Sequence, residues 1–241
     1  IKAKEAKACT DNGVEFIELP VAYDGLTIVL NNSNDWVDHL TVDELRKIFL
    51  ADQAVDSWSE VRKGWPDTPI KVYSPGTDSG TFDYFKEVVA GKTGSIRSDM
   101  QVSEDDNVLV RGVAGDAASI GFFGCAYYFE NADKLKACPI INGEGKPELP
   151  SKQSIESGTY NPFSRPLFIY VNLNSIKRPE VAGFVDFYLE NAGDMAEEVG
   201  YVRLPQAIYD RCQANVDNRR TGTQFLRDGE KVHGPLPEVY K

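Results

Sequence analysis

The stretch Ser74-Pro-Gly-Thr-Asp-Ser-Gly-Thr-Phe-Asp-Tyr-Phe85 joins a β-rich segment to an amphipathic helix. The preceding residues, Lys71-Val-Tyr73, are typical of a strand end, and Phe82, Phe85 and Val89 recur at helical spacing. Small hydrogen-bonding residues fill the turn between the strand and the helix. The stretch therefore predicts a strand, a polar turn and a helix in immediate succession.

The start of this helix is suited to bind an anion. A helix that begins near Ser79 leaves the backbone N–H groups of Ser79, Gly80 and Thr81 without partners inside the helix, and the helix dipole is positive there. Gly80 permits close backbone approach, and the two hydroxyl groups add donors for a tetrahedral oxyanion. The alternative is that Asp78 or Ser79 simply caps the helix. Because the turn itself contains no Gly-Lys-Ser/Thr, a nucleotide-binding Walker loop is not predicted.

Composition limits the possible functions. With 241 residues, of which 41% are hydrophobic, the chain can bury a sizeable core in one large or two small domains. The formal net charge of −11 argues against a nucleic-acid partner, which would favour a basic surface. This charge does not exclude an anion ligand, because salt screens surface carboxylates farther away than about 8–10 Å.

The four cysteines permit three full pairings. Cys125 and Cys138 flank a short helix-like segment and a return strand, so they are the favoured disulfide if the compartment is oxidising. The alternative is four buried thiols.

A metal site and a membrane span are not expected. The cysteines lack metal-ligand spacing, and the only histidines are His39 and His233. The chain has no run of about 20 apolar residues and no signal peptide.

Five motifs occur in order along the chain. They are Leu19-Pro-Val-Ala-Tyr-Asp-Gly-Leu26, Gly76-Thr-Asp-Ser-Gly-Thr-Phe-Asp-Tyr-Phe85, Ser103-Glu-Asp-Asp-Asn-Val-Leu-Val110, Gly121-Phe-Phe-Gly124 with Ala126-Tyr-Tyr128, and Ser164-Arg-Pro-Leu-Phe-Ile-Tyr-Val171. Together they make the chain resemble, nearly end to end, the periplasmic phosphate-binding proteins that feed ABC transporters, particularly the cyanobacterial-type branch.

The resemblance implies an α/β fold of the two-lobed, class II periplasmic-binding-protein type, with crossover hinge strands. Residues 1–23 would form part of lobe I, residues 24–166 lobe II, and residues 167–241 the return to lobe I and a C-terminal tail. The first lobe would be incomplete in this chain, because family members carry a further N-terminal region. That region ordinarily supplies another anion loop and the carboxylate that accepts the proton of hydrogen phosphate, so the chain would be a mature or truncated form.

The implied function is high-affinity binding of inorganic phosphate in a cleft between the lobes, and delivery to a membrane ABC permease. Ligand contacts would favour a closed state, with no cofactor and no catalysis. We expect a monomer in the periplasm or at the cell surface. The alternatives are another tetrahedral oxyanion, such as sulfate, molybdate or arsenate, or a role in sensing or scavenging phosphate without transport.

The predicted ligand residues are Asp78, Ser79, Gly80, Thr81 and Arg97. Arg97 would offer two oxygens of phosphate a bidentate guanidinium. Its alternative is a surface pairing with Asp99 or Glu104 that contributes little to stability. Asp78 could accept a ligand proton, although helix capping is favoured for it. Relatives that carry a ligand arginine shortly before Ser-Gly-Thr differ from this chain, which has Pro75-Gly-Thr77 there.

Three further residues are candidates to line a cleft. Arg165 competes with Arg97, or forms a salt bridge at the hinge. Tyr23 lies at the proposed first crossover, where packing on a lobe is the favoured alternative. Asp24 lies beside it and is favoured to form a turn with Gly25.

Prolines, glycines and helix-capping residues predict the remaining elements. The expected features are a strand from Phe16 to Leu19 that ends at Pro20, a crossover strand from Gly25 to Leu30, capping boxes at Thr41–Glu44 and Ser103–Asp106, a loop over 58–69, a strand at 121–123, a returning strand from Phe168 to Val171, and a helix from Pro179 through Leu189, with Met195 to Val199 beginning or continuing another. Two aromatic clusters are assigned to the core: Phe122, Phe123, Tyr127 and Tyr128, and Phe184, Phe187 and Tyr188.

Overall fold

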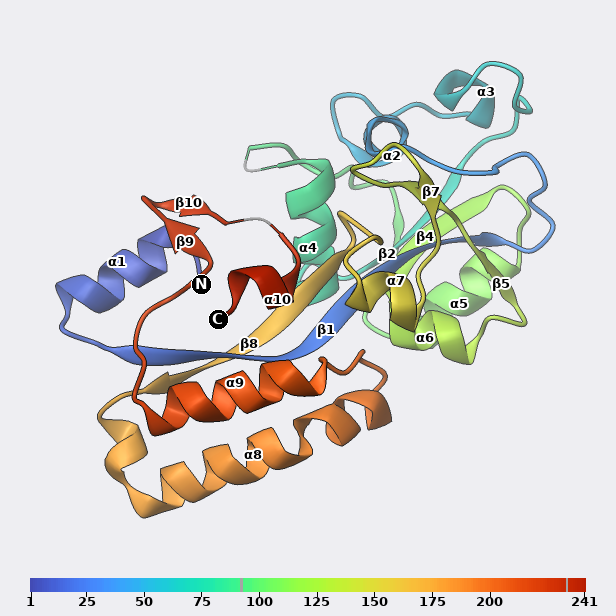
Figure 1. The fold of residues 1–241 in the computed structure, drawn as a ribbon. Coiled ribbons are helices and arrows are strands. Elements are labelled where there is room, and N and C mark those ends of the chain that lie inside the picture. The colour runs from blue at the N-terminus through green and yellow to red at the C-terminus, as the bar shows by residue number, and fades with distance from the viewer. Residues whose placement is uncertain (92, 233) are drawn as a thin grey trace. The chain divides into compact units, whose positions relative to one another are not determined.

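A computed structural model describes residues 1–91, 93–232 and 234–241 (Figure 1). The chain forms two compact units: unit 1 comprises residues 1–24, 156–158 and 165–241, and unit 2 comprises residues 25–155 and 159–164. The units thus change at 24/25 and 164/165, beside the predicted boundaries at 23/24 and 166/167. His233, considered above as a metal ligand, lies outside the described residues.

Strand β1 (Phe16–Asn31) runs without interruption from unit 1 into unit 2. The prediction that Pro20 ends one strand and that Gly25 begins another is wrong. Proline removes a single donor from a ladder, and the carbonyl of Pro20 instead accepts a hydrogen bond from the thiol of Cys212 at 3.4 Å. Every residue of β1 except Asp24 is buried. Burial along both faces of β1 therefore outweighs the tendency of Pro20 and Gly25 to interrupt a strand.

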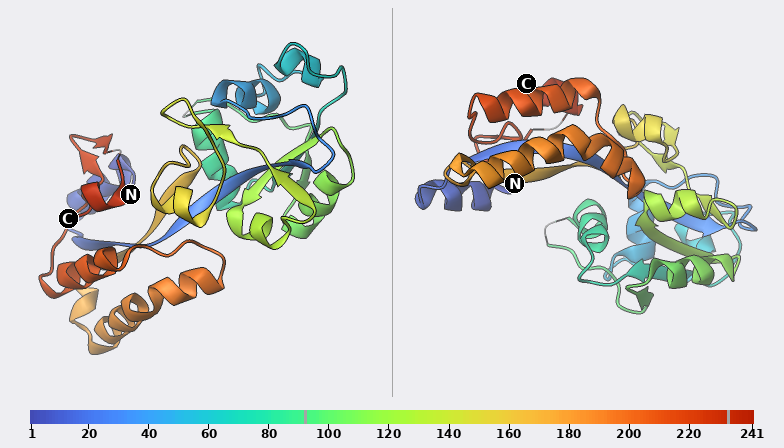
Figure 2. Two further views of the ribbon diagram at one scale, coloured as in Figure 1. Left: turned by 45° about the vertical axis from the view of Figure 1, so that its right-hand side comes forward. Right: turned by 90° about the horizontal axis from the view of Figure 1, so that it is seen from below.

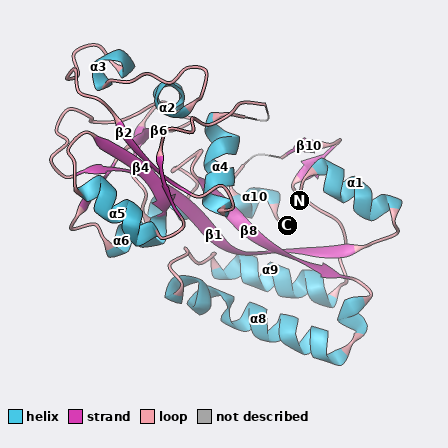
Figure 3. Cartoon of the chain, turned by 180° about the vertical axis from the view of Figure 1, so that it is seen from behind, coloured by secondary structure: helices cyan, strands magenta, loops and turns pink. Residues whose placement is uncertain are grey.

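In unit 2, a mixed sheet has the strand order β3-β2-β4-β1-β5. Figure 3 labels β2, β4 and β1 of this sheet. Strand β2 pairs in parallel with β3 and β4, whereas β1 pairs antiparallel with β4 and β5. The bounds are β2 Lys71–Pro75, β3 Gln101–Ser103, β4 Ser119–Gly124 and β5 Leu135–Ala137.

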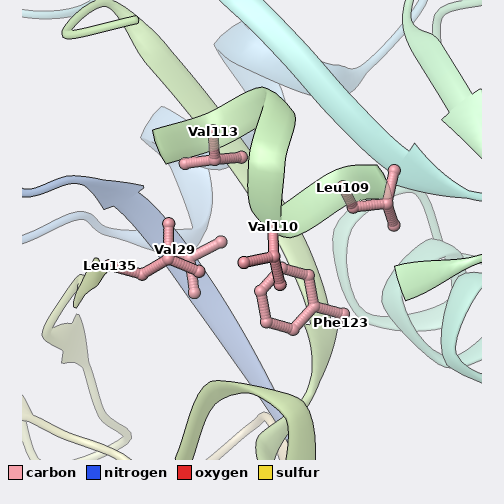
Figure 4. Close-up of a cluster of buried hydrophobic side chains, with 6 residues drawn as sticks. All are labelled: Val29, Leu109, Val110, Val113, Phe123 and Leu135. Atoms are coloured by element: carbon pink, nitrogen blue, oxygen red, sulfur yellow. The ribbon is translucent and has the colours of Figure 1, made fainter. Parts of the chain in front are cut away.

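Strand β4 separates two apolar layers, because Phe122 and Phe123 alternate in direction along it. Phe122 stacks on Phe85 of α4 (Gly80–Val89), with ring centroids 3.9 Å apart, and meets Phe49 of α2 (Val42–Phe49) at 5.7 Å. Phe123 belongs to the opposite cluster, in which α5 (Asp106–Ala114) covers the sheet (Figure 4). That cluster comprises Val29, Leu109, Val110, Val113, Phe123 and Leu135.

The capping predictions have different outcomes. The Thr41 box is confirmed: Thr41 Oγ1 accepts the N–H of Glu44 at 3.1 Å, and the Glu44 carboxylate accepts the N–H of Thr41 at 2.9 Å. The Ser103 box is wrong, because Asp105 is the N-cap of α5 and accepts the N–H of Asn107 at 2.9 Å. Ser103 instead accepts the N–H of Asp105 and holds the turn before the helix.

Unit 1 is built on the first part of β1, which pairs with β8 (Ser164–Asn172), and on the helices α8 (Pro179–Glu198) and α9 (Gln206–Asp217). Figures 1 and 2 show α8 and α9 lying side by side. Helix α8 is continuous through Met195. The assignment of Phe184 and Phe187 to the core is wrong, since they are 61% and 57% exposed, and so is that of Tyr127 in unit 2, which is 39% exposed. The buried face of α8 is instead formed by Val185, Leu189, Ala192, Gly193 and Ala196.

The remaining elements are short or peripheral, and α3 lies within the predicted 58–69 loop. Their bounds are α1 Ala3–Asp11, α3 Trp58–Val61, α6 Cys125–Glu130, β6 Ile140–Ile141, β7 Pro147–Glu148, α7 Lys152–Glu156, η1 Ser175–Lys177, β9 Leu226–Arg227, β10 Glu230–Lys231 and α10 Leu236–Val239. Among the described residues, the helices are too short or too polar to cross a membrane.

All four cysteines carry reduced thiols, so the predicted Cys125–Cys138 disulfide is absent. The Cys125 sulfur accepts a hydrogen bond from Thr27 Oγ1 at 3.0 Å, and the Cys138 thiol donates to the Pro139 carbonyl at 3.5 Å. Burial raises the pKa of the Cys138 thiol well above its usual range. Deprotonation, which precedes disulfide exchange, is therefore disfavoured there.

The ring of Tyr73 on β2 fixes how closely α5 approaches the sheet. A Cβ on Gly112 of α5 would lie 2.1 Å from Tyr73 Cε1, and a Cβ on Gly121 of β4 would lie 3.2 Å from Tyr73 Cβ. We expect Gly112→Ala to destabilise unit 2 by about 1 kcal/mol net, because an overpacking cost of about 1–3 kcal/mol exceeds the gain in helix propensity. Chemical denaturation monitored by circular dichroism measures this change.

Gly183→Ala in α8 is the matched control, because a Cβ there would meet no described atom within 4 Å. Helix propensity alone should make this variant more stable, by up to about 1 kcal/mol. Equal effects of the two substitutions would contradict the proposed constraint.

The thiol state predicts the result of alkylation. In denatured protein without reductant, a maleimide should add to all four cysteines. In native protein, Cys9 should react first, because it is the one cysteine that is not buried. Mass spectrometry of the adducts measures both results. Only two adducts per chain after denaturation would show that two cysteines form a disulfide.

Candidate functional site

The predicted anion loop lies at the carboxyl edge of two parallel strands. Pro75 at the end of β2 pairs with Ser103 at the end of β3. The chain then continues from Pro75 through residues 76–79 into α4, and from Ser103 into the turn before α5. In open α/β sheets, ligands bind outside the carboxyl ends of parallel strands. The pairing therefore places the Ser-Gly-Thr segment where such folds bind ligands.

Helix α4 begins at Gly80, and Ser79 is its N-cap. Ser79 Oγ accepts the N–H of Thr81 at 3.2 Å, and the N–H of Ser79 donates to the Gly76 carbonyl at 3.1 Å. The expected capping by Asp78 is therefore wrong. As expected, the N–H groups of Ser79 and Thr81 have no partners inside the helix, but the preceding turn and the serine side chain supply acceptors for them.

This capping is compatible with anion binding. A hydroxyl group has one donor and two acceptor lone pairs, so Ser79 can accept from Thr81 and donate to a ligand at the same time. The ten-residue helix α4 directs its positive dipole end at this position. The segment can therefore present hydroxyl donors and a favourable field to a tetrahedral oxyanion.

Acidic residues lie next to this segment. Glu104, Asp105 and Asp106 follow β3, and Asp106 is half-buried. Burial, and then the charges of Asp105 and Glu104, raise the pKa of Asp106. The Glu104 carboxylate packs against Gly76 of the anion loop. The local field therefore combines a positive helix end with neighbouring carboxylates.

Arg97 links the end of α2 to Asp99 and to the segment that follows the helix. Its Nε and Nη2 each donate to the Asp99 carboxylate at 2.7 Å, and its Nη1 donates to the carbonyls of Ile48 and Val55, at 3.1 Å each. The side chain is only 10% exposed. The structure thus shows the alternative pairing with Asp99, and the arginine is more buried than that alternative assumed.

The hydrogen bonds from Arg97 lower the pKa of Asp99 to about 2. A carboxyl group whose pKa is lowered on folding stabilises the folded state at pH values above its unfolded pKa, which is near 3.8. That contribution falls as the pH drops towards 2. The ion pair is therefore formed throughout the neutral range.

The three cleft candidates of unit 1 lie where β1 and β8 change units. Arg165 Nε and Nη2 contact Asp24 Oδ2, at 3.2 Å each, so the alternative of a salt bridge at this position is confirmed. The expected turn at Asp24-Gly25 is wrong, because both residues belong to β1. Tyr23 is 5% exposed and exchanges two backbone hydrogen bonds with Val202. Burial is the main cause that raises the pKa of Tyr23 to about 12.

The structure brings Asp78, Ser79, Gly80 and Thr81 together at one helix end, and places Arg97 in the same unit beside the end of α2. Sequence reasoning missed Glu104 as a neighbour of the loop. Only the strand register could have revealed it. Among the described residues, no cluster of three or more His, Cys, Asp or Glu could hold a metal ion.

Comparison with known proteins identifies the family. Residues 1–192 match the PBP superfamily domain. The SphX protein of Synechococcus elongatus is 48% identical over all of this chain and 71% of its own length. The phosphate-binding protein PstS of Staphylococcus saprophyticus is 38% identical over 96% of this chain and 70% of its own length.

Solved structures agree with this fold. A possible phosphate-binding protein from Planctomyces limnophilus superposes with a TM-score of 0.81 at 46% identity, over 90% of this chain and 77% of that one. A putative phosphate ABC transporter substrate-binding protein from Clostridium perfringens, solved with bound phosphate, gives a TM-score of 0.61 at 26% identity, over 85% of this chain and 76% of that one. The chain therefore belongs to the PBP superfamily, together with the SphX and PstS proteins.

Proposed function

We propose that the chain binds inorganic phosphate and delivers it to a membrane ABC transporter. The observation that carries this proposal is the Ser79-Gly80-Thr81 segment at the N-terminus of α4, beside the carboxyl edge of β2 and β3. Support comes from the PstS relatives, which are named phosphate-binding proteins, and from the Clostridium perfringens structure with bound phosphate.

The proposed ligand contacts are the Ser79 and Thr81 side chains and the backbone at Gly80, with Asp78 as a nearby acceptor for a ligand proton. Hydrogen bonds to a charged partner contribute about 1.5–3 kcal/mol each. Arg97 stays a prediction as a ligand, since a bidentate contact with phosphate would compete with its bonds to Asp99. The same holds for Arg165, which pairs with Asp24, and for Tyr23 and Asp24 as cleft residues.

We propose a monomeric solute-binding protein without catalytic activity, located in the periplasm or at the cell surface, with no nucleic-acid partner. Sulfate, molybdate and arsenate are the competing ligands, and sensing or scavenging is the competing role. Calorimetric titration of phosphate, with sulfate as competitor, tests the ligand. Sulfate binding as tight as phosphate binding would overturn the assignment.

Replacing Ser79 and Thr81 together by alanine should weaken phosphate binding by several kcal/mol, because two hydroxyl donors to a charged ligand are lost. Isothermal titration calorimetry measures the change. Loss of the Ser79 cap also costs stability, so a matched cap variant is required. Thr41→Ala removes the cap of α2 in the same unit and should lower stability while leaving phosphate affinity unchanged. Equal phosphate affinities in the double variant and the parent would remove the loop from the site.

Arg97→Lys separates a structural role from a ligand role. Lysine cannot reproduce the planar fork that joins Asp99 and two carbonyls. We expect a loss of unfolding free energy of about 1.5–3 kcal/mol, measured by chemical denaturation, with little change in phosphate affinity. Weaker phosphate binding at unchanged stability would instead make Arg97 a ligand. Arg165→Lys, titrated in parallel, tests the competing arginine.

A further inference from the structure

Gly76 is buried, although the two residues that follow it in the loop are exposed. A Cβ placed on Gly76 would lie 1.5 Å from Glu104 Oε1, 2.2 Å from Cδ and 2.8 Å from Oε2. The Glu104 carboxylate therefore lies where a Cβ at position 76 would be, and a larger residue there would displace it. Gly76 does not have a positive φ, so a side chain at this position would be opposed by the Glu104 carboxylate and not by the backbone conformation.

The strand register brings the two residues together. Pro75 pairs with Ser103, so Gly76 and Glu104 are the next residues along two adjacent parallel strands. The backbone around Glu104 is held on both sides, because Ser103 Oγ accepts the N–H of Asp105 at 3.0 Å and Asp105 caps α5. Glu104 is exposed overall, and its carboxylate is the part that rests on the loop.

A chain of contacts links this carboxylate to the proposed ligand groups. The Gly76 carbonyl accepts the N–H of Ser79 at 3.1 Å, and Ser79 Oγ accepts the N–H of Thr81 at 3.2 Å. A displacement of Gly76 would therefore move the residue that caps α4 and carries a proposed donor. Fixing such donors before the ligand arrives lowers the entropic cost of binding.

We propose that Glu104 is a positioning residue of the anion loop: its carboxylate holds Gly76, and thereby orients Ser79 for the ligand. This proposal rests on the proposed phosphate site. The negative charge itself opposes an anion, so shape and packing of the side chain provide the benefit. Glutamine keeps that shape without the charge, whereas alanine removes the contact. The two substitutions should therefore have different effects.

Calorimetric titration of inorganic phosphate into four variants tests the proposal. Glu104→Ala and Gly76→Ala should each weaken phosphate binding by roughly tenfold, the first by removing the carboxylate and the second by displacing it. Glu104→Gln should bind phosphate at least as tightly as the parent. In the double variant, Gly76→Ala should add little to Glu104→Ala, because contacting residues are energetically coupled.

Glu130→Ala, which removes an exposed carboxylate elsewhere in unit 2, should bind phosphate like the parent. Parent-like phosphate binding by Glu104→Ala, or additive effects of the two alanine substitutions, would overturn the positioning role. Glutamine as harmful as alanine would also overturn it, because charge and not packing would then be responsible. Failure of the parent itself to bind phosphate would instead overturn the proposed function, so the two failures are distinguishable.

Discussion

The parallel pairing of β2 with β3 and β4 is the constraint on which the candidate site depends. It aligns the ends of β2 and β3 at Pro75 and Ser103, and so brings the start of α4 beside the turn before α5. Parallel strands need long crossover connections, and here those connections supply the two helix starts. The close approach of α5 to Tyr73, permitted by Gly112, fixes the same strand from one face. Sheet register and helix packing therefore place the anion loop, and its own hydrogen bonds hold the turn.

Local sequence signals predicted what depends on neighbouring residues. The Thr41 capping box and the helix after Ser79 were predictable because each cap reaches only two or three residues along the chain. Tertiary context decided the rest. Pro20 did not end β1, because burial of the strand along its length outweighs the loss of one ladder donor. Asp105 replaced Ser103 as the cap of α5, because Ser103 is the last residue of β3 and pairs with Pro75.

The aromatic residues also show that tertiary context decides what local sequence signals cannot. Phe122 and Phe123 are buried as predicted, because consecutive residues of a central strand face two different layers. Phe184 and Phe187 have helical spacing but lie opposite the aliphatic face of α8, so they are exposed. Spacing predicts that residues share a face, whereas composition alone does not determine which face is buried.

For the candidate site, sequence identified the segment and structure added its restraints. Ser79 was predictable as a residue of the anion loop, but its dual use as cap and proposed donor depends on geometry. Arg97 illustrates the converse case: a guanidinium near the loop in sequence bonds to the Asp99 carboxylate, to a carbonyl in the last turn of α2 and to the carbonyl of Val55 beyond that helix. Glu104 carried no sequence signal, because its contact with Gly76 exists only once β2 and β3 pair in register. A net charge of −11 is compatible with such a site, since donors and a helix dipole within hydrogen-bond distance act locally while distant carboxylates are screened.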